Sequence, residues 1–153
     1  MTSMTRRRFL GQVGRASGCL ACAGVLPVGL GGCASVPWAS YERTGSRITL
    51  PLSAFDDTDG VLLDLPDRPA PLYVHRAAGI DGEERFTAVL TLCMHQGCTA
   101  APQGSRIVCP CHGSEYAQDG TLLRGPSERD LIRFPATVTD ERVWIHLNGV
   151  EDG

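Results

Sequence analysis

Two short segments of the chain carry cysteine and histidine at a spacing typical of metal ligands. The first, residues 93–98, is CMHQGC, and the second, residues 109–116, is CPCHGSEY. A Cys-x-His pair and a Cys-x-x-His pair, separated by 13 residues, can reach one centre from two tight loops. Two thiolates and two imidazoles suit a structural zinc ion, and they also suit an iron–sulfur cluster with mixed ligands. On ligand type alone, both kinds of site stay open.

Three features of these segments weigh against zinc. Each segment holds one further cysteine, Cys98 and Cys111, whereas a zinc ion needs only four protein ligands. In an exported protein such a pair indicates a disulfide, which would tie the two loops together over the metal. The third feature is the Gly113-Ser114-x-Tyr116 run, which places two hydroxyl donors just after the last histidine.

The paired segments resemble the signature of the Rieske family, in which C-T-H-x-G-C is followed by C-P-C-H-G-S-x-Y or F. The resemblance implies one 2Fe–2S cluster as cofactor. Cys93 and Cys109 would bind one iron, and His95 and His112 would bind the other. It also implies an antiparallel β-sandwich that carries a small cluster-binding subdomain of two loops.

The same resemblance assigns roles to residues that are not ligands. Cys98 and Cys111 correspond to the disulfide between the family's ligand loops. The hydroxyl of Ser114 corresponds to a donor to a bridging sulfide, and the phenol of Tyr116 to a donor to the sulfur of Cys93. Hydrogen bonds to the sulfurs stabilise the reduced cluster and raise its potential.

Two further positions bear on how the cluster is covered. Gly125-Pro126 resembles the family's proline loop, which covers the cluster from a third side. Met94 stands where the family usually has threonine, and Gln96 where an apolar residue is common. A polar Gln96 would wet the cluster or alter its docking surface.

The ligand set indicates electron transfer. Neutral imidazoles reduce the negative charge of the cluster, so an added electron costs less, and mixed-ligand centres span roughly −150 to +300 mV. The two hydroxyl donors favour the upper part of that range.

We therefore expect an electron-transfer component of a respiratory-type oxidoreductase rather than a standalone catalyst, resembling the Rieske subunit of quinol–cytochrome c reductase or the small subunit of arsenite oxidase. A cytochrome c or a larger oxidoreductase subunit is the expected partner, and a quinol is a further candidate. The alternatives are a structural zinc module and a quinol-contacting subunit of a cytochrome bc-type complex.

The N-terminal segment predicts export. Residues 5–10 are TRRRFL, and residues 16–40 contain no charged side chain. A basic start followed by an apolar stretch is typical of a secretory signal, and the paired arginines resemble a twin-arginine signal. Residues 30–33, LGGC, resemble a lipobox, which makes Cys33 a candidate for lipidation. Removal of the signal, lipidation of Cys33 and retention of the segment as a membrane anchor stay open, and the expected location is periplasmic or otherwise extracytoplasmic.

The elements that must position the ligands are predicted to be short strands. The chain of 153 residues has 18 Gly and 10 Pro, and no segment keeps a helical apolar period for three turns. The expected strands cover Ile48–Leu52, Val61–Leu65, Leu72–Ala77, Arg85–Leu92, Ile107–Val108, Ala136–Thr139 and Arg142–Leu147. The last two form a hairpin pattern around Asp140-Glu141. The sequence thus predicts an all-β, antiparallel domain at 47–148, after a signal or anchor at 1–33 and a linker at 34–46.

Charge excludes one class of function. The first 32 residues hold four arginines and no acidic residue, whereas the remainder holds 10 Arg against 17 Asp and Glu. A nucleic-acid-binding domain needs clustered basic side chains to contact phosphates. The acidic body therefore argues against a nucleic-acid partner.

Overall fold

The computed structural model describes residues 35–78 and 84–149, which all belong to one compact unit, Ala34–Gly153. The predicted signal or anchor at 1–33, including Cys33, lies outside the described residues and stays a prediction. Within the two described ranges, no helix is long and apolar enough to cross a membrane.

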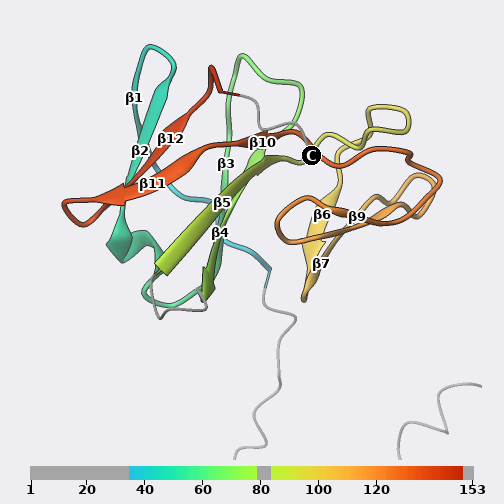
Figure 1. Ribbon diagram of the computed structural model, residues 1–153, viewed down its shortest axis with the longest axis horizontal. Coiled ribbons are helices and arrows are strands. Elements are labelled where there is room, and N and C mark those ends of the chain that lie inside the picture. The colour runs from blue at the N-terminus through green and yellow to red at the C-terminus, as the bar shows by residue number, and fades with distance from the viewer. Residues whose placement is uncertain (1–34, 79–83, 150–153) are drawn as a thin grey trace, which may run out of the picture. The chain divides into compact units, whose positions relative to one another are not determined.

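The described chain consists of short strands (Figure 1). One 3-10 helix, η2 (Leu52–Phe55), follows the second strand. The strands are β1 (Glu42–Thr44), β2 (Arg47–Pro51), β3 (Gly60–Leu63), β4 (Leu72–Ala78), β5 (Glu84–Leu90), β6 (Ala101–Gln103), β7 (Arg106–Val108), β8 (Glu115–Ala117), β9 (Leu122–Arg124), β10 (Arg133–Phe134), β11 (Ala136–Thr139) and β12 (Arg142–His146).

The strands form three antiparallel sheets of four strands each. Their orders are β1-β2-β12-β11, β10-β5-β4-β3 and β6-β7-β8-β9. Figure 1 shows the β6–β9 sheet to one side of the other two. The first two sheets draw on both ends of the described chain, whereas the third is built from one continuous stretch between β5 and β10.

The β10-β5-β4-β3 sheet contributes side chains to two separate cores. Leu72 and Val74 of β4 point into one core and Tyr73 into the other, because successive residues of a strand face opposite ways. The sandwich core lies between the first two sheets; its buried residues are Ile48, Leu50, Phe55, Val61, Leu63, Leu65, Ala70, Leu72, Val74, Phe86, Ala88, Leu90, Phe134, Val143, Ile145 and Leu147. The cluster core consists of Tyr73, Val89, Cys93, Ala100, Ile107, Cys109, Tyr116 and Leu131. The β10-β5-β4-β3 sheet, the middle sheet, therefore packs against the candidate ligand region through Tyr73 and Val89.

The all-β antiparallel fold predicted from the sequence is confirmed. The hairpin around Asp140-Glu141 is present as β11 and β12, with Ala136 opposite Ile145 and Thr139 opposite Arg142. β1 lies inside the range predicted as a linker, and Ala39 already donates its N–H to the carbonyl of Leu62. The last part of that range is thus hydrogen-bonded to the folded body.

Candidate metal centre

The first ligand loop, residues 93–98, is a tight turn between β5 and β6. The N–H of Cys93 donates to the carbonyl of Cys98 at 2.8 Å, and the N–H of Gly97 donates to the carbonyl of Cys93 at 2.9 Å. Gly97 has φ +74°, a left-handed conformation that residues with a Cβ rarely adopt. A bridge between Leu92 and Thr99 closes the base of the loop.

The second ligand loop, residues 109–114, repeats this backbone arrangement between β7 and β8. The N–H of Cys109 donates to the carbonyl of Ser114 at 2.9 Å, and the N–H of Gly113 donates to the carbonyl of Cys109 at 3.0 Å. Gly113 has φ +75°. The two loops thus share one hydrogen-bonding scheme although their side chains differ.

A disulfide joins the two loops. Cys98 and Cys111 are bonded, with their Cα atoms 6.6 Å apart and a sequence separation of 13, which confirms the predicted pair. Because these two sulfurs bind each other, they are not available as metal ligands. The free thiols among the described residues are Cys93 and Cys109.

The four predicted ligands have graded exposure. Cys93 and Cys109 are 2% and 1% exposed, whereas His95 is half-buried and His112 is exposed. The two imidazole rings lie 4.9 Å apart between centroids, with their planes at 90°. Nδ1 of His95 is buried and has no hydrogen-bond partner in the described structure, although a buried ring nitrogen normally has one. A buried ring nitrogen without a partner, in the same loop as the buried thiol of Cys93, fits a metal ligand.

Hydrogen bonds shift the pKa values of the two thiols in opposite directions. Burial raises the pKa of Cys109, and its hydrogen bond with Cys93 raises it further. Burial opposes ionisation of Cys93 as well, but hydrogen bonds from the phenol of Tyr116 and from the backbone of His95 outweigh it and lower the pKa of Cys93. A thiolate is the form that binds metal, so Cys93 is the better prepared of the two.

The phenol of Tyr116 lies against the first ligand loop. Its Oη is 3.3 Å from Sγ of Cys93 and accepts the backbone N–H of Met94, also at 3.3 Å. Because Oη accepts from Met94, its own hydrogen is available to the sulfur. Burial raises the pKa of Tyr116, and the neighbouring Cys93 raises it further, so the phenol keeps the proton that it donates.

Ser114 is fully buried, and its Oγ accepts the backbone N–H of Ser127 at 3.0 Å. Ser127 has no signature in the sequence beyond its place next to Gly125-Pro126. This hydrogen bond places the third segment beside the second ligand loop, and the Gly125-Pro126 peptide bond is cis. With its acceptor role satisfied, the Ser114 hydroxyl has its proton free to donate.

Charged side chains brace the second ligand loop from β7, β8 and β9. Glu115 pairs with Arg106 and, at 2.9 Å, with Arg124. Arg124 also donates to the carbonyl of Gly113 at 3.4 Å. Glu115 is only 13% exposed, so its carboxylate is held between the two guanidinium groups. This network was not predicted, because charge pairing across short strands has no signature in one sequence.

Comparison with protein-family models gives one match. Residues 53–135 match the model described as the Rieske [2Fe-2S] domain, which is more than half of the chain. The chain belongs to the Rieske family. One 2Fe–2S cluster is therefore its cofactor, and the buried thiols, the two imidazoles and the orphaned Nδ1 of His95 fit that group.

Similar proteins include iron-sulfur subunits of cytochrome b6-f complexes. "Cytochrome b6-f complex iron-sulfur subunit 2" of Nostoc sp. (strain PCC 7120) is 32% identical over 96 residues, which cover 61% of this chain and 52% of the relative. The cytochrome b6-f complex iron-sulfur subunit of Synechococcus elongatus (strain ATCC 33912) is 30% identical over 112 residues, covering 70% of this chain and 60% of that subunit. This chain spans about half the length of the first of these relatives.

A solved Rieske structure has the same fold. The cyanobacterial plasma membrane Rieske protein PetC3 from Synechocystis PCC 6803 superposes with a TM-score of 0.52 at 28% identity. The superposition covers 62% of this chain and 93% of that protein.

Proposed function

We propose that this Rieske protein transfers single electrons through its 2Fe–2S cluster, as an extracytoplasmic component of a larger oxidoreductase. Cys93 and Cys109 hold one iron, and His95 and His112 hold the other. The observation that carries this assignment is the buried, unpartnered Nδ1 of His95, in a protein whose two free thiols, Cys93 and Cys109, are also buried. When bound, the cluster supplies a one-electron couple.

The residues around the ligands prepare the site for its two redox states. The hydroxyls of Tyr116 and Ser114 both hydrogen-bond with the sulfur of Cys93, where negative charge grows on reduction. This supports a potential in the upper part of the range for mixed-ligand centres. The exposed ring of His112 offers the route by which an electron reaches a partner, whereas the thiols stay in the cluster core.

The partner and the location rest on indirect support. The similar proteins include subunits of cytochrome b6-f complexes and a plasma membrane protein, which supports a membrane-associated oxidoreductase as the partner. A cytochrome c or a larger redox subunit would accept the electron, and a quinol is a candidate donor. Arg6 and Arg7 would direct export by the twin-arginine route. Changing both to lysine should leave the holoprotein in the cytoplasmic fraction, and unchanged export would contradict that route.

The test of the proposed function is the metal content and spectrum of the full chain. We expect two irons and two acid-labile sulfides per chain, visible absorption when oxidised, and an electron paramagnetic resonance signal when reduced. A colourless protein that holds one zinc and gives no signal would overturn the proposal in favour of a structural zinc module. For the protein with its cluster, a redox titration at several pH values would test for a quinol donor. Proton-coupled reduction makes the potential of the cluster fall as the pH rises.

A further inference from the structure

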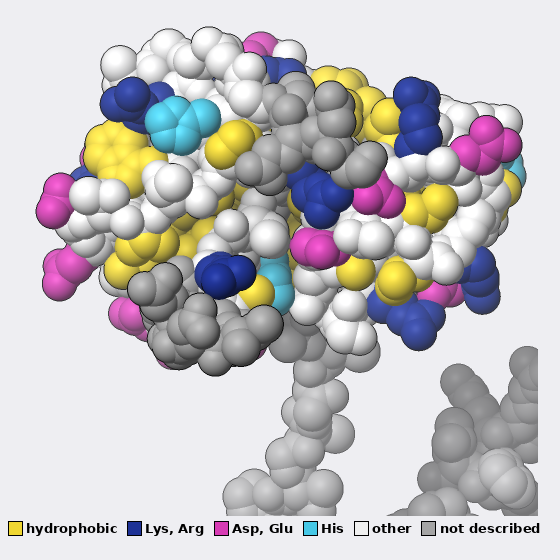
Figure 2. Space-filling view, in the orientation of Figure 1, with side chains coloured by type: hydrophobic (Ala, Val, Ile, Leu, Met, Phe, Trp, Pro, Cys, Tyr) yellow, Lys and Arg dark blue, Asp and Glu magenta, His cyan; other side chains and the backbone are white. Residues whose placement is uncertain are grey.

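The outer face of the β1-β2-β12-β11 sheet holds a hollow of about 250 Å³ that the cluster does not use. Figure 2 shows histidine, basic and hydrophobic side chains gathered over this sheet. The lining residues are Arg47, Thr137, Thr139, Asp140, Trp144 and His146. The strand register explains why they share a face: Trp144 lies opposite Thr137, and His146 lies opposite Arg47.

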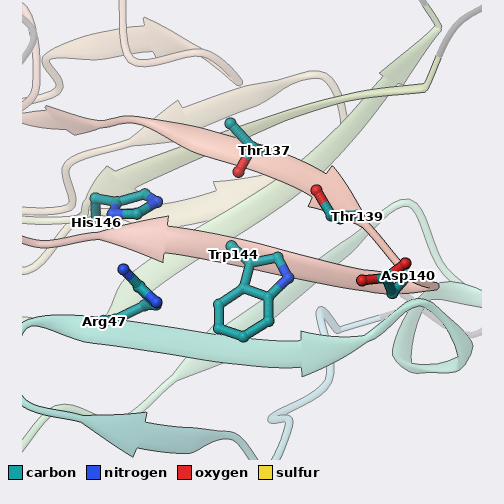
Figure 3. A pocket seen from close by; sticks show the side chains of 6 residues that line it. All are labelled: Arg47, Thr137, Thr139, Asp140, Trp144 and His146. Atoms are coloured by element: carbon teal, nitrogen blue, oxygen red, sulfur yellow. The ribbon is translucent and has the colours of Figure 1, made fainter.

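The two ends of the hollow differ in charge, and an aromatic ring lies between them. Figure 3 shows Arg47 and His146 toward one end, Trp144 in the middle and Asp140 at the hairpin turn. His146 and Arg142 are the two ends of β12, and the four steps between them span roughly 13 Å at strand rise. The hollow is thus cationic at one end and acidic at the other.

Arg47 differs from the other arginines of this sheet. Arg43 pairs with Asp67, and Arg142 pairs with Glu42, both at 2.6 Å. Arg47 has no carboxylate partner in the part of the chain that the structure describes, and its guanidinium carbon lies 5.5 Å from the centroid of the Trp144 ring. Although the chain has 17 acidic residues, the guanidinium of Arg47 lines the hollow and pairs with no carboxylate of the described residues. A guanidinium binds a planar carboxylate through two parallel hydrogen bonds.

Asp140 provides the carboxylate at the opposite end of the hollow, from a turn with a left-handed backbone. It has φ +52°, and Glu141 beside it has φ +58°, so both turn residues are left-handed without being glycine. Two-residue hairpin turns require positive φ, which glycine and asparagine adopt most easily. Non-glycine residues in this region gather at functional sites more than elsewhere. The turn holds the carboxylate of Asp140 at the rim of the hollow.

We propose that this hollow binds a small organic anion with a carboxylate on one six-membered ring and a hydroxyl at its far end. The carboxylate pairs with Arg47, assisted by His146. The ring lies along Trp144 and the hydroxyls of Thr137 and Thr139. Asp140 accepts the hydrogen of the far hydroxyl. A hollow of 250 Å³ has room for one such ring and is smaller than sites for drug-sized ligands. An aromatic acid and an acidic sugar both carry this chemistry.

The test uses the full holoprotein with Trp38→Phe, so that its remaining tryptophan, Trp144, reports binding by fluorescence. The probes are 4-hydroxybenzoate for the aromatic acids, D-glucuronate for the acidic sugars, and 4-hydroxybenzyl alcohol as the neutral control. Isothermal titration calorimetry provides a second readout. We expect saturable binding of at least one of the two anions and much weaker binding of the neutral alcohol. Binding of only one anion identifies the source, and binding of both shows that the ring carboxylate alone is recognised.

Variants separate a binding site from a charged surface. Arg47→Gln should weaken binding at least about tenfold, because the loss of a bidentate charge pair typically costs that much. Arg142→Gln is the matched control, since Arg142 lies on the same sheet but pairs with Glu42 outside the hollow, and it should bind as the parent does. An unchanged cluster spectrum shows that each variant is folded. No saturation by either anion up to about 10 mM, or equal losses in both variants, would overturn the proposal. Neither result bears on electron transfer, which is measured at the cluster.

Discussion

The two cores of this Rieske protein are built from different materials. The 16 buried residues of the sandwich core are all aliphatic or phenylalanine. The cluster core has eight, and four of them are cysteine or tyrosine, whose sulfur or hydroxyl needs a partner. The sandwich core can therefore form by burial of apolar surface alone, whereas the cluster core depends on coordination, hydrogen bonds and a disulfide. Changes in one core should thus leave distinct signs from changes in the other.

The largest effect should come from removing a thiolate ligand. Cys93→Ser or Cys109→Ser should abolish the visible absorption and the paramagnetic signal, because a neutral hydroxyl is a poor iron ligand. Amide hydrogen exchange should then speed up in β6–β9 and stay slow in β4 and β5, whose buried residues lie largely in the sandwich core. Loss of protection across all three sheets would show that the two cores do not fold independently.

The converse change is Phe55→Ala in the sandwich core. Phe55 is fully buried and packs edge-on against Phe86 with ring centroids 4.8 Å apart. We expect about 3–5 kcal/mol of lost stability by chemical denaturation, the usual cost of emptying such a site. The potential and the spectrum of the folded fraction should not change. A shifted potential would mean that packing strain passes through the shared middle sheet.

The disulfide ranks next. A double change of Cys98 and Cys111 to serine should lower stability by roughly 3 kcal/mol, because a bridge that closes a loop of this length restricts the unfolded chain by about that amount. Iron should be lost faster to a chelator, and hydrogen exchange should rise in residues 93–98 and 109–114. Since Cys111 is exposed, mild reduction of the parent protein should reproduce the effect. An unchanged rate of iron loss would show that the disulfide does not retain the cluster.

Removing one hydroxyl should change the potential more than the stability. Tyr116→Phe removes the donor 3.3 Å from the sulfur of Cys93. A hydrogen bond worth about 1 kcal/mol more in the reduced state corresponds to roughly 40 mV, so the potential should fall by that order. Ser114→Ala should lower it in the same direction. The cluster should remain in both variants, and unchanged potentials would show that these hydroxyls do not reach sulfur.

The smallest effect concerns a surface ion pair at the edge of the first sheet. The hydrogen bond from Arg43 lowers the pKa of Asp67 from 3.8 to about 2. A carboxyl whose pKa is depressed on folding stabilises the protein above its unfolded pKa and loses that contribution as the pH falls. The parent should therefore lose its small advantage over Asp67→Asn between about pH 4 and pH 2. A constant difference over that window would contradict the cause, and because the pair is exposed we expect the difference to be slight.

The sequence predicted the sandwich better than it predicted the surroundings of the cluster. The strand around Ile48 and the hairpin at Asp140-Glu141 were predicted because apolar alternation and turn residues are local signals. β6, β8, β9 and β10 were missed, since strands of two or three residues give no measurable alternation, and β6 contains Pro102. β1 lies in the range predicted as a linker, since its residues are polar and stand among Pro37, Ser40, Gly45 and Ser46.

The site shows the same division. The disulfide partners followed from their positions in the two motifs, and the structure confirms them. The ligand set stays a prediction whose geometry fits. The contact of Ser127 with Ser114 and the pairing of Glu115 with Arg106 and Arg124 join different strands and loops of the third sheet. Such contacts depend on how the third sheet folds over the loops, which no local pattern records.

The hydrogen bonds of Leu62 fix where the N-terminal chain joins the folded body. Its N–H donates to the carbonyl of Pro37 and its carbonyl accepts the N–H of Ala39, both at 2.9 Å, so the chain is fastened to β3 from residue 37 onward. If Cys33 carries a lipid, the tether from Cys33 to Pro37 is four residues long, or at most about 14 Å when fully extended. With so short a tether, the folded domain would stay close to the membrane surface, so its redox partners would have to bind it there.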